Sequence, residues 1–264
     1  MIKVFMFGVR RHCKPALLVW AAMGLTVHPG TLHAGGIVSL NLCTDQLLVQ
    51  LAPERVAGLE PMARDPALSS VAAVAQTMPL VRADAEAVLM LKPDLVLAGQ
   101  YGAQTTLALL RSHGLSVLQL DDPQDFPAIA AQVTVVASLL GVPARGQALV
   151  ARMWQRLGAI RPRSGTAVLW EAGGWTAGPG SLGAAVLHAA GLTNIGTGGR
   201  LGLEALLVRP PGHLVRETAP RFPSIATDLA RHPALAGILR LDVPARLLIC
   251  GGPQAAGAAE VLGR

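Results

Sequence analysis

The sequence has few aromatic and few charged residues. Of its 264 residues, 3% are aromatic, 14% are charged and 52% are hydrophobic. It contains neither the GxSxG sequence of a nucleophile elbow nor the HExxH pair of a zinc enzyme, and it has no histidine-rich loop. The residue types of a catalytic triad are present but do not converge: Ser39, Asp45, His113, His188, His213 and His232. These absences argue against an enzyme and against a receptor for free metal ions.

The N-terminal segment has the pattern of a secretory signal peptide. Residues 1–14 carry four basic side chains and no acid, residues 16–27 form an uncharged apolar run, and a small residue, Ala34, follows. The run is short for a membrane span, which needs roughly 20 apolar residues. We expect export to the periplasm and cleavage near Ala34; the alternative is an uncleaved anchor.

Cleavage would remove much of the positive charge. The full chain has a formal net charge of +6. Residues 1–34 contain four basic residues and no acid, so their removal would leave a net charge of +2. No dense basic stripe is left. We therefore expect no binding to nucleic acid.

After this segment, short apolar strands alternate with helices, which is typical of parallel α/β sheets. The expected strands are residues 35–41, 54–59, 95–98, 115–121, 166–170, 212–217 and 245–250. The expected helices are residues 43–52, 85–91, 105–114, 181–191 and 203–208.

The middle of the chain contains no strand signal. Gly141 and Pro143 split it into two helices, the second at about residues 144–160. The fold class is therefore α/β, with two α/β lobes of short parallel sheets joined by a long central helix and a ligand cleft between them. The predicted parts are the signal peptide (1–34), an N-terminal lobe (35–125), a helical linker with the backbone helix (126–162) and a C-terminal lobe (163–264).

The two halves repeat one unit. Residues 85–96 and 203–215 each contain a Glu-led apolar helix, a proline turn and a strand, with Glu86 and Glu204 at matching places. The overall spacing differs by one residue. The alternative is that each acid is simply favoured in the first turn of its helix by the helix dipole.

Four stretches carry a family resemblance: IVSLNLCTDQLL, LKPDLVLAG, GGWTAGPGSLG and CGGP. From Ile37 to about Leu262, the chain resembles the periplasmic substrate-binding proteins of ABC importers for cobalamin and ferric siderophores. The resemblance implies a monomer without a cofactor, which captures a bulky metal chelate and delivers it to an inner-membrane permease. It also implies that Glu86 and Glu204 dock onto the permease. The alternatives are a haem or free-metal receptor of the same fold and a secreted α/β-hydrolase-type enzyme.

The loops that follow the strands should form the cleft walls. Trp175 lies in a glycine-rich loop and Tyr101, the only tyrosine, follows a strand; both suit stacking on a bulky ligand. Asn41 ends the first strand and is a further candidate. The alternative for Trp175 is a side chain folded over its own lobe.

Two arginines are candidates for an anionic ligand. Arg82 and Arg200 would pair with carboxylate or phosphate groups if they face the cleft, or be solvated loop charges if they do not. The aromatic residue that we expect near Leu80 in a cobalamin binder is absent. A corrinoid and an anionic ferric chelate both remain open.

Cys43 and Cys250 both follow expected strands, one in each half. Three interpretations compete: a disulfide across the cleft floor, two free thiols that ligate a metal or chelate, or two small residues that pack without meeting. An oxidising compartment would favour the disulfide.

Overall fold

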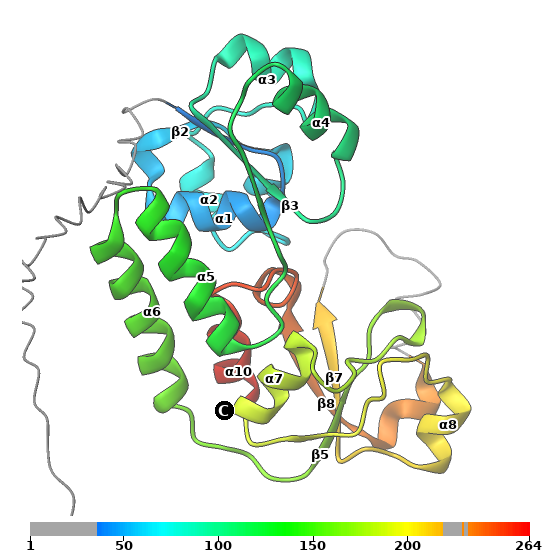
Figure 1. Cartoon of the computed structure of the whole chain (residues 1–264). Helices are drawn as coiled ribbons and strands as arrows, with labels where there is room; N and C mark the ends of the chain where they lie inside the picture. Colours follow the sequence, from blue (N-terminus) through cyan, green and yellow to red (C-terminus); the bar gives the residue numbers. More distant parts are fainter. Residues whose placement is uncertain (1–35, 219–228, 230–231) are drawn as a thin grey trace, which may run out of the picture. The chain divides into compact units, whose positions relative to one another are not determined.

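The computed structural model describes residues 36–218, 229 and 232–264, so the predicted signal peptide lies outside the described residues. Two parallel sheets of four strands each confirm the α/β prediction (Figure 1). The first has the order β2-β1-β3-β4, with β1 (Ile37–Ser39), β2 (Val56–Gly58), β3 (Leu95–Gly99) and β4 (Val117–Leu120). The second has the order β6-β5-β7-β8, with β5 (Thr166–Leu169), β6 (Thr193–Asn194), β7 (His213–Thr218) and β8 (Leu239–Pro244).

The helices are α1 (Leu42–Leu51), α2 (Ala72–Ala75), α3 (Ala85–Leu91), α4 (Gln104–Ser112), α5 (Phe126–Leu139), α6 (Pro143–Gly158), α7 (Leu182–Ala189), α8 (Leu203–Val208) and α10 (Ala255–Leu262). The 3₁₀ turns are η1 (Pro53–Arg55), η2 (Pro61–Arg64), η3 (Ala172–Gly174), η5 (Pro233–Gly237) and η6 (Ala245–Leu247). Within the described ranges, none of the helices has both the length and the apolar character that crossing a bilayer requires.

The repeat predicted from the sequence corresponds to equivalent elements of the two sheets. In each sheet the second strand along the chain lies at the edge and the third lies beside the first. Helix α3 leads into β3 and helix α8 leads into β7, each the third strand of its sheet. Glu86 and Glu204 therefore lie in the first turns of equivalent helices.

Each sheet is buried on both faces, as parallel sheets are. Along β3, Leu95 and Leu97 enter one large core, whereas Val96 and Ala98 enter a smaller core under α3 and α4. This alternation follows from the two-residue period of a strand. Strand β5 divides its side chains between the large core and a separate small core in the same way.

The large core runs through both sheets without interruption. It takes in side chains of β1, β3, β5 and β7 together with α1, α5, α6, α7 and α10, so α5 and α6 act as more than a linker. The core extends across residues 125 and 162, the predicted ends of the N-terminal lobe and of the helical linker. The division into these domains therefore remains a prediction. Figure 1 shows α5, α6 and α10 side by side.

The strand predicted at residues 245–250 is wrong. The last strand, β8, ends at Pro244, and residues 245–247 form η6, with Leu248 N–H and Ile249 N–H both donating to the Ala245 carbonyl at 2.9 Å. A short apolar run does not distinguish a strand from a buried turn. The alternating segment just before it forms β8, which pairs with β7 over six residues of each strand.

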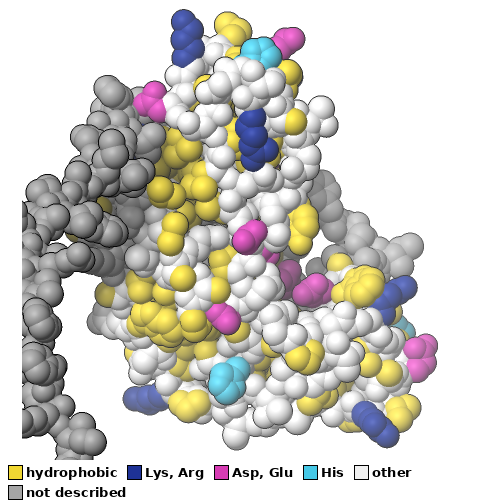
Figure 2. Space-filling model, viewed as in Figure 1, with side chains coloured by type: hydrophobic (Ala, Val, Ile, Leu, Met, Phe, Trp, Pro, Cys, Tyr) yellow, Lys and Arg dark blue, Asp and Glu magenta, His cyan; other side chains and the backbone are white. Residues whose placement is uncertain are grey.

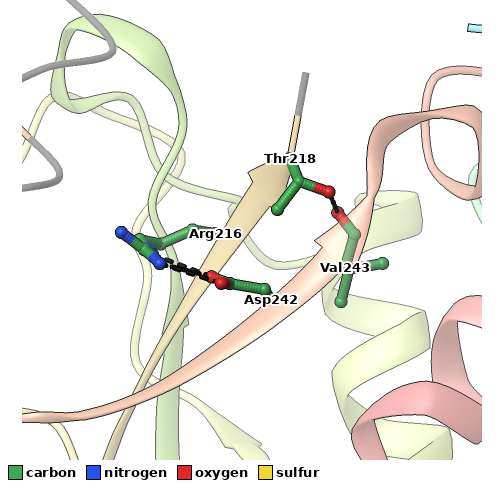
Figure 3. A network of polar contacts seen from close by, with 4 residues as sticks. All are labelled: Arg216, Thr218, Asp242 and Val243. Carbon is green, nitrogen blue, oxygen red and sulfur yellow. Dashed lines mark hydrogen bonds and ion pairs between the residues drawn. The ribbon is translucent and has the colours of Figure 1, made fainter. Parts of the chain in front are cut away.

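The β7–β8 pair carries a cross-strand ion pair. Arg216 lies opposite Asp242 in the register, and its Nη2 donates to the two carboxylate oxygens at 2.6 and 2.9 Å (Figure 3). The neighbouring Thr218 hydroxyl donates to the Val243 carbonyl at 3.4 Å. These contacts lie at the carboxyl end of β7, where the second sheet meets the cleft.

Two glycines of α6 provide a test of the helical layer. A Cβ at Gly146 would lie 2.4 Å from the Ala137 Cβ of α5, whereas a Cβ at Gly158 would meet no atom within 4 Å. We expect Gly146→Val to lower the free energy of unfolding by about 1–3 kcal/mol through overpacking. Gly158→Val should stay within about 0.5 kcal/mol of the unmodified protein. Guanidinium chloride unfolding measures both, and equal effects would contradict the close approach of α5 and α6.

Candidate functional site

The carboxyl ends of the first sheet open onto a cavity of about 200 Å³, called here the first cavity. Its walls come from the residues after β1, β3 and β4, from α1 and α5, and from the C-terminal segment between η6 and α10. The lining residues are Asn41, Cys43, Thr44, Gln46, Leu47, Gln50, Gly99, Gln100, Tyr101, Leu120, Asp121, Asp122, Pro123, Gln132, Val133, Ile249, Gly251, Gly252, Pro253 and Gln254. This is the edge at which ligands bind in open parallel sheets.

The carboxyl ends of β5 and β7 open onto a second cavity, of about 460 Å³. It is lined by Asp122, Gln124, Leu169, Glu171, Thr176, Ala177, Gly178, Pro179, Gly180, Ser181, Leu182, Gly183, Gly198, Glu217 and Leu248. Asp122 lines both cavities, and its Oδ1 accepts a hydrogen bond from Gly251 N–H at 3.2 Å. The two cavities therefore adjoin and form one cleft between the sheets.

A disulfide joins the two halves of the chain at the first cavity. Cys43 and Cys250 are bonded, with their Cα atoms 5.2 Å apart. Asn41 caps α1 by accepting from Cys43 N–H at 2.9 Å, and Gln46 Nε2 donates to Cys250 Sγ at 3.2 Å. Of the three interpretations, the structure shows the disulfide, which leaves no free thiol for a metal while it is intact.

Several predicted residues lie where a ligand would reach them. Asn41, Cys43 and Tyr101 line the first cavity, and Tyr101 is 77% exposed. Cys250 is buried behind the lining. Trp175 lines neither cavity but precedes Thr176, which lines the second, and its side chain is 51% exposed.

The two candidate arginines lie elsewhere. Arg82 and Arg200 are exposed and line neither cavity. Arg200 pairs with Trp175 through a backbone bridge, and its Nε donates to the Gly173 carbonyl at 3.0 Å. The guanidinium is thus held against the loop that follows β5 and is not part of the lining of either cavity.

In the described part of the chain, the charged side chains that line the cleft are all acidic. They are Asp121, Asp122, Glu171 and Glu217, and acidic side chains gather around the hollow in Figure 2. Uncharged amides supply much of the remaining polar lining: Asn41, Gln46, Gln50, Gln100, Gln124, Gln132 and Gln254. Of these amides, only Asn41 was predicted to bind the ligand, because amide residues have no characteristic spacing. Gln100, just after β3, falls in a loop that was expected to form the cleft wall, and Asp121 follows β4 in the same way.

One carboxyl group of the second cavity titrates close to neutrality. Burial by the surrounding protein, and then the negative charge of Glu171, raise the pKa of Glu217 to about 7. Burial also raises the pKa of Glu171. Both side chains nevertheless keep solvent-exposed area within the cleft. The raised pKa values show that negative charge is already unfavourable at Glu171 and Glu217, so an anionic ligand group is disfavoured beside them in the second cavity.

The cleft offers little to a bare metal ion. In the part of the chain that the structure describes, no three His, Cys, Asp or Glu side chains are grouped so that they could hold one. The polar side chains that line the cleft are amides, carboxylates, three hydroxyl residues (Thr44, Thr176 and Ser181) and one phenol, which suit an organic ligand with hydrogen-bonding groups on its surface.

Two similar sheets with their carboxyl ends on one cleft define a two-lobed binding protein. A family model described as periplasmic binding protein matches residues 37–238, and the chain belongs to that family. The family is one of binding proteins, which confirms the prediction that the chain is not an enzyme.

Among curated proteins, a cobalamin-binding protein of Halobacterium salinarum is 36% identical over 121 residues, 42% of this chain. The match covers only 32% of that protein's length. Among solved structures, the heme-binding protein RhuT from Roseiflexus sp. RS-1 has a TM-score of 0.70 and 24% identity, covering 86% of this chain and 96% of that one. The vitamin B12 binding protein BtuF of Vibrio cholerae has a TM-score of 0.61 and 17% identity, covering 86% and 94%. These structures support the fold.

Behind the cleft, Asp45 of α1 is completely buried. Its Oδ2 accepts from Glu60 N–H at 3.2 Å, and its Oδ1 has no hydrogen-bond partner among the described residues. Burial raises the pKa of Asp45 to about 8, although a hydrogen bond from Ser39 acts in the opposite direction. The folded protein therefore holds a proton here that the unfolded chain releases near pH 4.

This proton makes a testable contribution to stability. Between about pH 4 and pH 8 the folded state binds the extra proton, so the Asp45 contribution to the free energy of unfolding should fall as the pH rises. Asp45→Asn keeps an oxygen for Glu60 N–H and cannot ionise. We expect the variant to gain stability relative to the unmodified protein between pH 5 and pH 8, as measured by denaturant unfolding. Parallel pH profiles of the two proteins would show that Asp45 is ionised in the folded state.

Proposed function

We propose that the protein is the periplasmic solute-binding component of an ABC importer, which captures a corrinoid such as cobalamin and delivers it to an inner-membrane permease. The family and the signal-peptide pattern of residues 1–34 support the first part. The observation that carries the choice of ligand is the lining of the cleft, which combines amide side chains with carboxylates and, among the residues that the structure describes, contains no Lys or Arg.

This lining suits a corrinoid better than an anionic chelate. The propionates of haem and the acidic groups of many ferric siderophores would face Asp121, Asp122 and the Glu171–Glu217 pair without a compensating cation. A corrin ring carries primary amides around its edge, which can exchange hydrogen bonds with Asn and Gln side chains. The curated relative named for cobalamin binding supports the same choice.

The ligand would extend across both cavities. Neither cavity alone, at about 200 and 460 Å³, would enclose a molecule as large as cobalamin, but they adjoin at Asp122. Tyr101 at the first cavity and Trp175 beside the second would provide apolar faces for the macrocycle.

Haem is the second candidate, and Tyr101 is the observation that favours it. A phenolate is a known axial ligand of haem iron, and the Tyr101 side chain is exposed at the first cavity. Solved structures of similar fold are named for heme binding.

Two equivalent surfaces support docking to a permease. Glu86 on α3 is followed one turn later by Met90, which is 83% exposed, and Glu204 on α8 is followed one turn later by Val208, which is 78% exposed. Residues four apart share a helix face. Each lobe therefore presents one acid beside one solvent-exposed apolar side chain, an arrangement suited to a partner with two equivalent sites.

Ligand titrations test the proposed function. The processed protein is titrated with cyanocobalamin, haem and ferric siderophores while tryptophan fluorescence is followed, with correction for ligand absorbance. We expect saturable quenching by cyanocobalamin at micromolar concentration. Trp175→Ala should weaken that binding by about three- to tenfold, the magnitude of one lost aromatic contact.

Trp154→Ala is the matched control, because Trp154 is similarly exposed, at 42%, but packs against Phe126 outside the cleft. Its affinity for cyanocobalamin should equal that of the unmodified protein. If only haem gave saturable quenching, and if Tyr101→Phe abolished it, haem would replace the corrinoid as the proposed ligand. Saturation by ferric siderophores alone would contradict both ligands.

Docking is tested separately from ligand capture. We expect Glu86→Ala with Glu204→Ala to abolish corrinoid-dependent transport in cells while the dissociation constant for cyanocobalamin stays unchanged, because both acids lie outside the cleft. Glu54→Ala with Glu260→Ala is the control, since it also removes two exposed acids, whose surface ion pairs contribute little. Full transport by the docking variant would refute the assignment of these surfaces.

A further inference from the structure

A third cavity, of about 400 Å³, lies between α6, η6 and the segment that precedes α10. It is lined by Gln50, Ser70, Val71, Leu149, Arg152, Met153, Arg156, Arg246, Leu247, Pro253 and Gln254. Gln50, Pro253 and Gln254 also line the first cavity, so they form a wall common to both. The proposed import function does not use this third cavity.

Its charge is opposite to that of the cleft. Within the described part of the chain, the charged side chains that line it are Arg152, Arg156 and Arg246, and no acid lines it. Glu260, outside the lining, lies 3.3 Å from Arg156 Nε and is also paired with Arg264 at 2.6 Å. Among the described residues, Arg152 and Arg246 form neither an ion pair nor a side-chain hydrogen bond. The cavity therefore carries excess positive charge.

This arrangement costs free energy unless an anion balances it. Arg152 and Arg156 lie one turn apart on α6, where like charges destabilise a helix by a few tenths of a kcal/mol. Arg246 adds a third positive charge from a separate element. Guanidinium groups bind phosphate through paired hydrogen bonds, and three of them around one cavity form a site of the kind that phosphate groups occupy.

The rest of the lining suits an organic phosphate better than a free phosphate ion. Val71, Leu149, Met153 and Leu247 give the cavity an apolar side, and the first three of these are buried or nearly so. A cavity of about 400 Å³ is also much larger than a phosphate ion needs. An organic phosphate could place its phosphate between the arginines and its apolar atoms against these side chains.

We propose that the third cavity is a binding site for a phosphate group carried on an apolar body. Such a group can come from a soluble phosphate ester or from the head group of a phospholipid. The site requires Arg152 and Arg246 as free cations and is independent of the ligand held in the cleft.

Calorimetric titration tests the site with phenyl phosphate as the probe and phenol as its uncharged control. The processed protein should bind phenyl phosphate and not phenol. Arg152→Gln with Arg246→Gln should weaken this binding by about tenfold or more, as expected for lost hydrogen bonds between charged groups. Arg111→Gln with Arg209→Gln removes the same charge from exposed positions outside the described cavities and should leave the affinity unchanged.

Thermal unfolding without any probe gives a second readout. At low ionic strength, Arg152→Gln with Arg246→Gln should raise Tm relative to the unmodified protein, because it removes repulsion, and salt should abolish the difference. A lower Tm at every salt concentration would mean that the two arginines stabilise the fold, and would overturn the proposal.

Vesicles distinguish the two sources of phosphate. Binding of phenyl phosphate without sedimentation on phosphatidylglycerol vesicles assigns a soluble ester. Arginine-dependent sedimentation on those vesicles, but not on phosphatidylcholine vesicles, assigns an anionic lipid head group. Either result supports the phosphate site. No binding to phenyl phosphate or to vesicles, or equal losses in the two pairs of arginine variants, overturns it.

Discussion

The structure depends on one apolar core that passes through both sheets. Ile37 and Leu97 of the first sheet, Leu169 and Val215 of the second, and Val133 of α5 belong to the same cluster of buried side chains. Close-packed interiors resist separation, so the lobes cannot move far apart without exposing this cluster to water. The disulfide acts at the same junction. The core and the disulfide together therefore restrain how far the two sides of the cleft can separate.

The shared core also brings unlike electrostatic environments close together. Carboxylates from both sheets gather at the cleft, whereas arginines of α6 and η6 gather at the third cavity. Only Gln50, Pro253 and Gln254 line both the first and third cavities. The residues on the common wall are neutral, so they separate the acidic lining of the first cavity from the arginines of the third.

The sequence predicted the two sheets well because their information is local. Strand alternation, helix periodicity and the repeat around Glu86 and Glu204 each extend over a few residues. The site was less predictable. Arg82 precedes α3 and Arg200 lies in the loop between β6 and α8, but local pattern does not determine where a side chain points, and neither lines the cleft. The amide lining comes from segments far apart in the sequence. The Cys43–Cys250 bond, which spans 207 residues, needed the tertiary structure.

The position of the disulfide has a consequence for the order of folding after export. The bond joins residues 43 and 250, so an exported chain could close it only after the 207 residues that separate them had been translocated. The third cysteine, Cys13, falls in the segment predicted to be cleaved. Of the three cysteines in this sequence, processing would leave Cys43 and Cys250, which can pair only with each other. Oxidation would then need no isomerase to correct a wrong cysteine pairing. The bond would form only in chains in which folding had already brought Cys43 and Cys250 together.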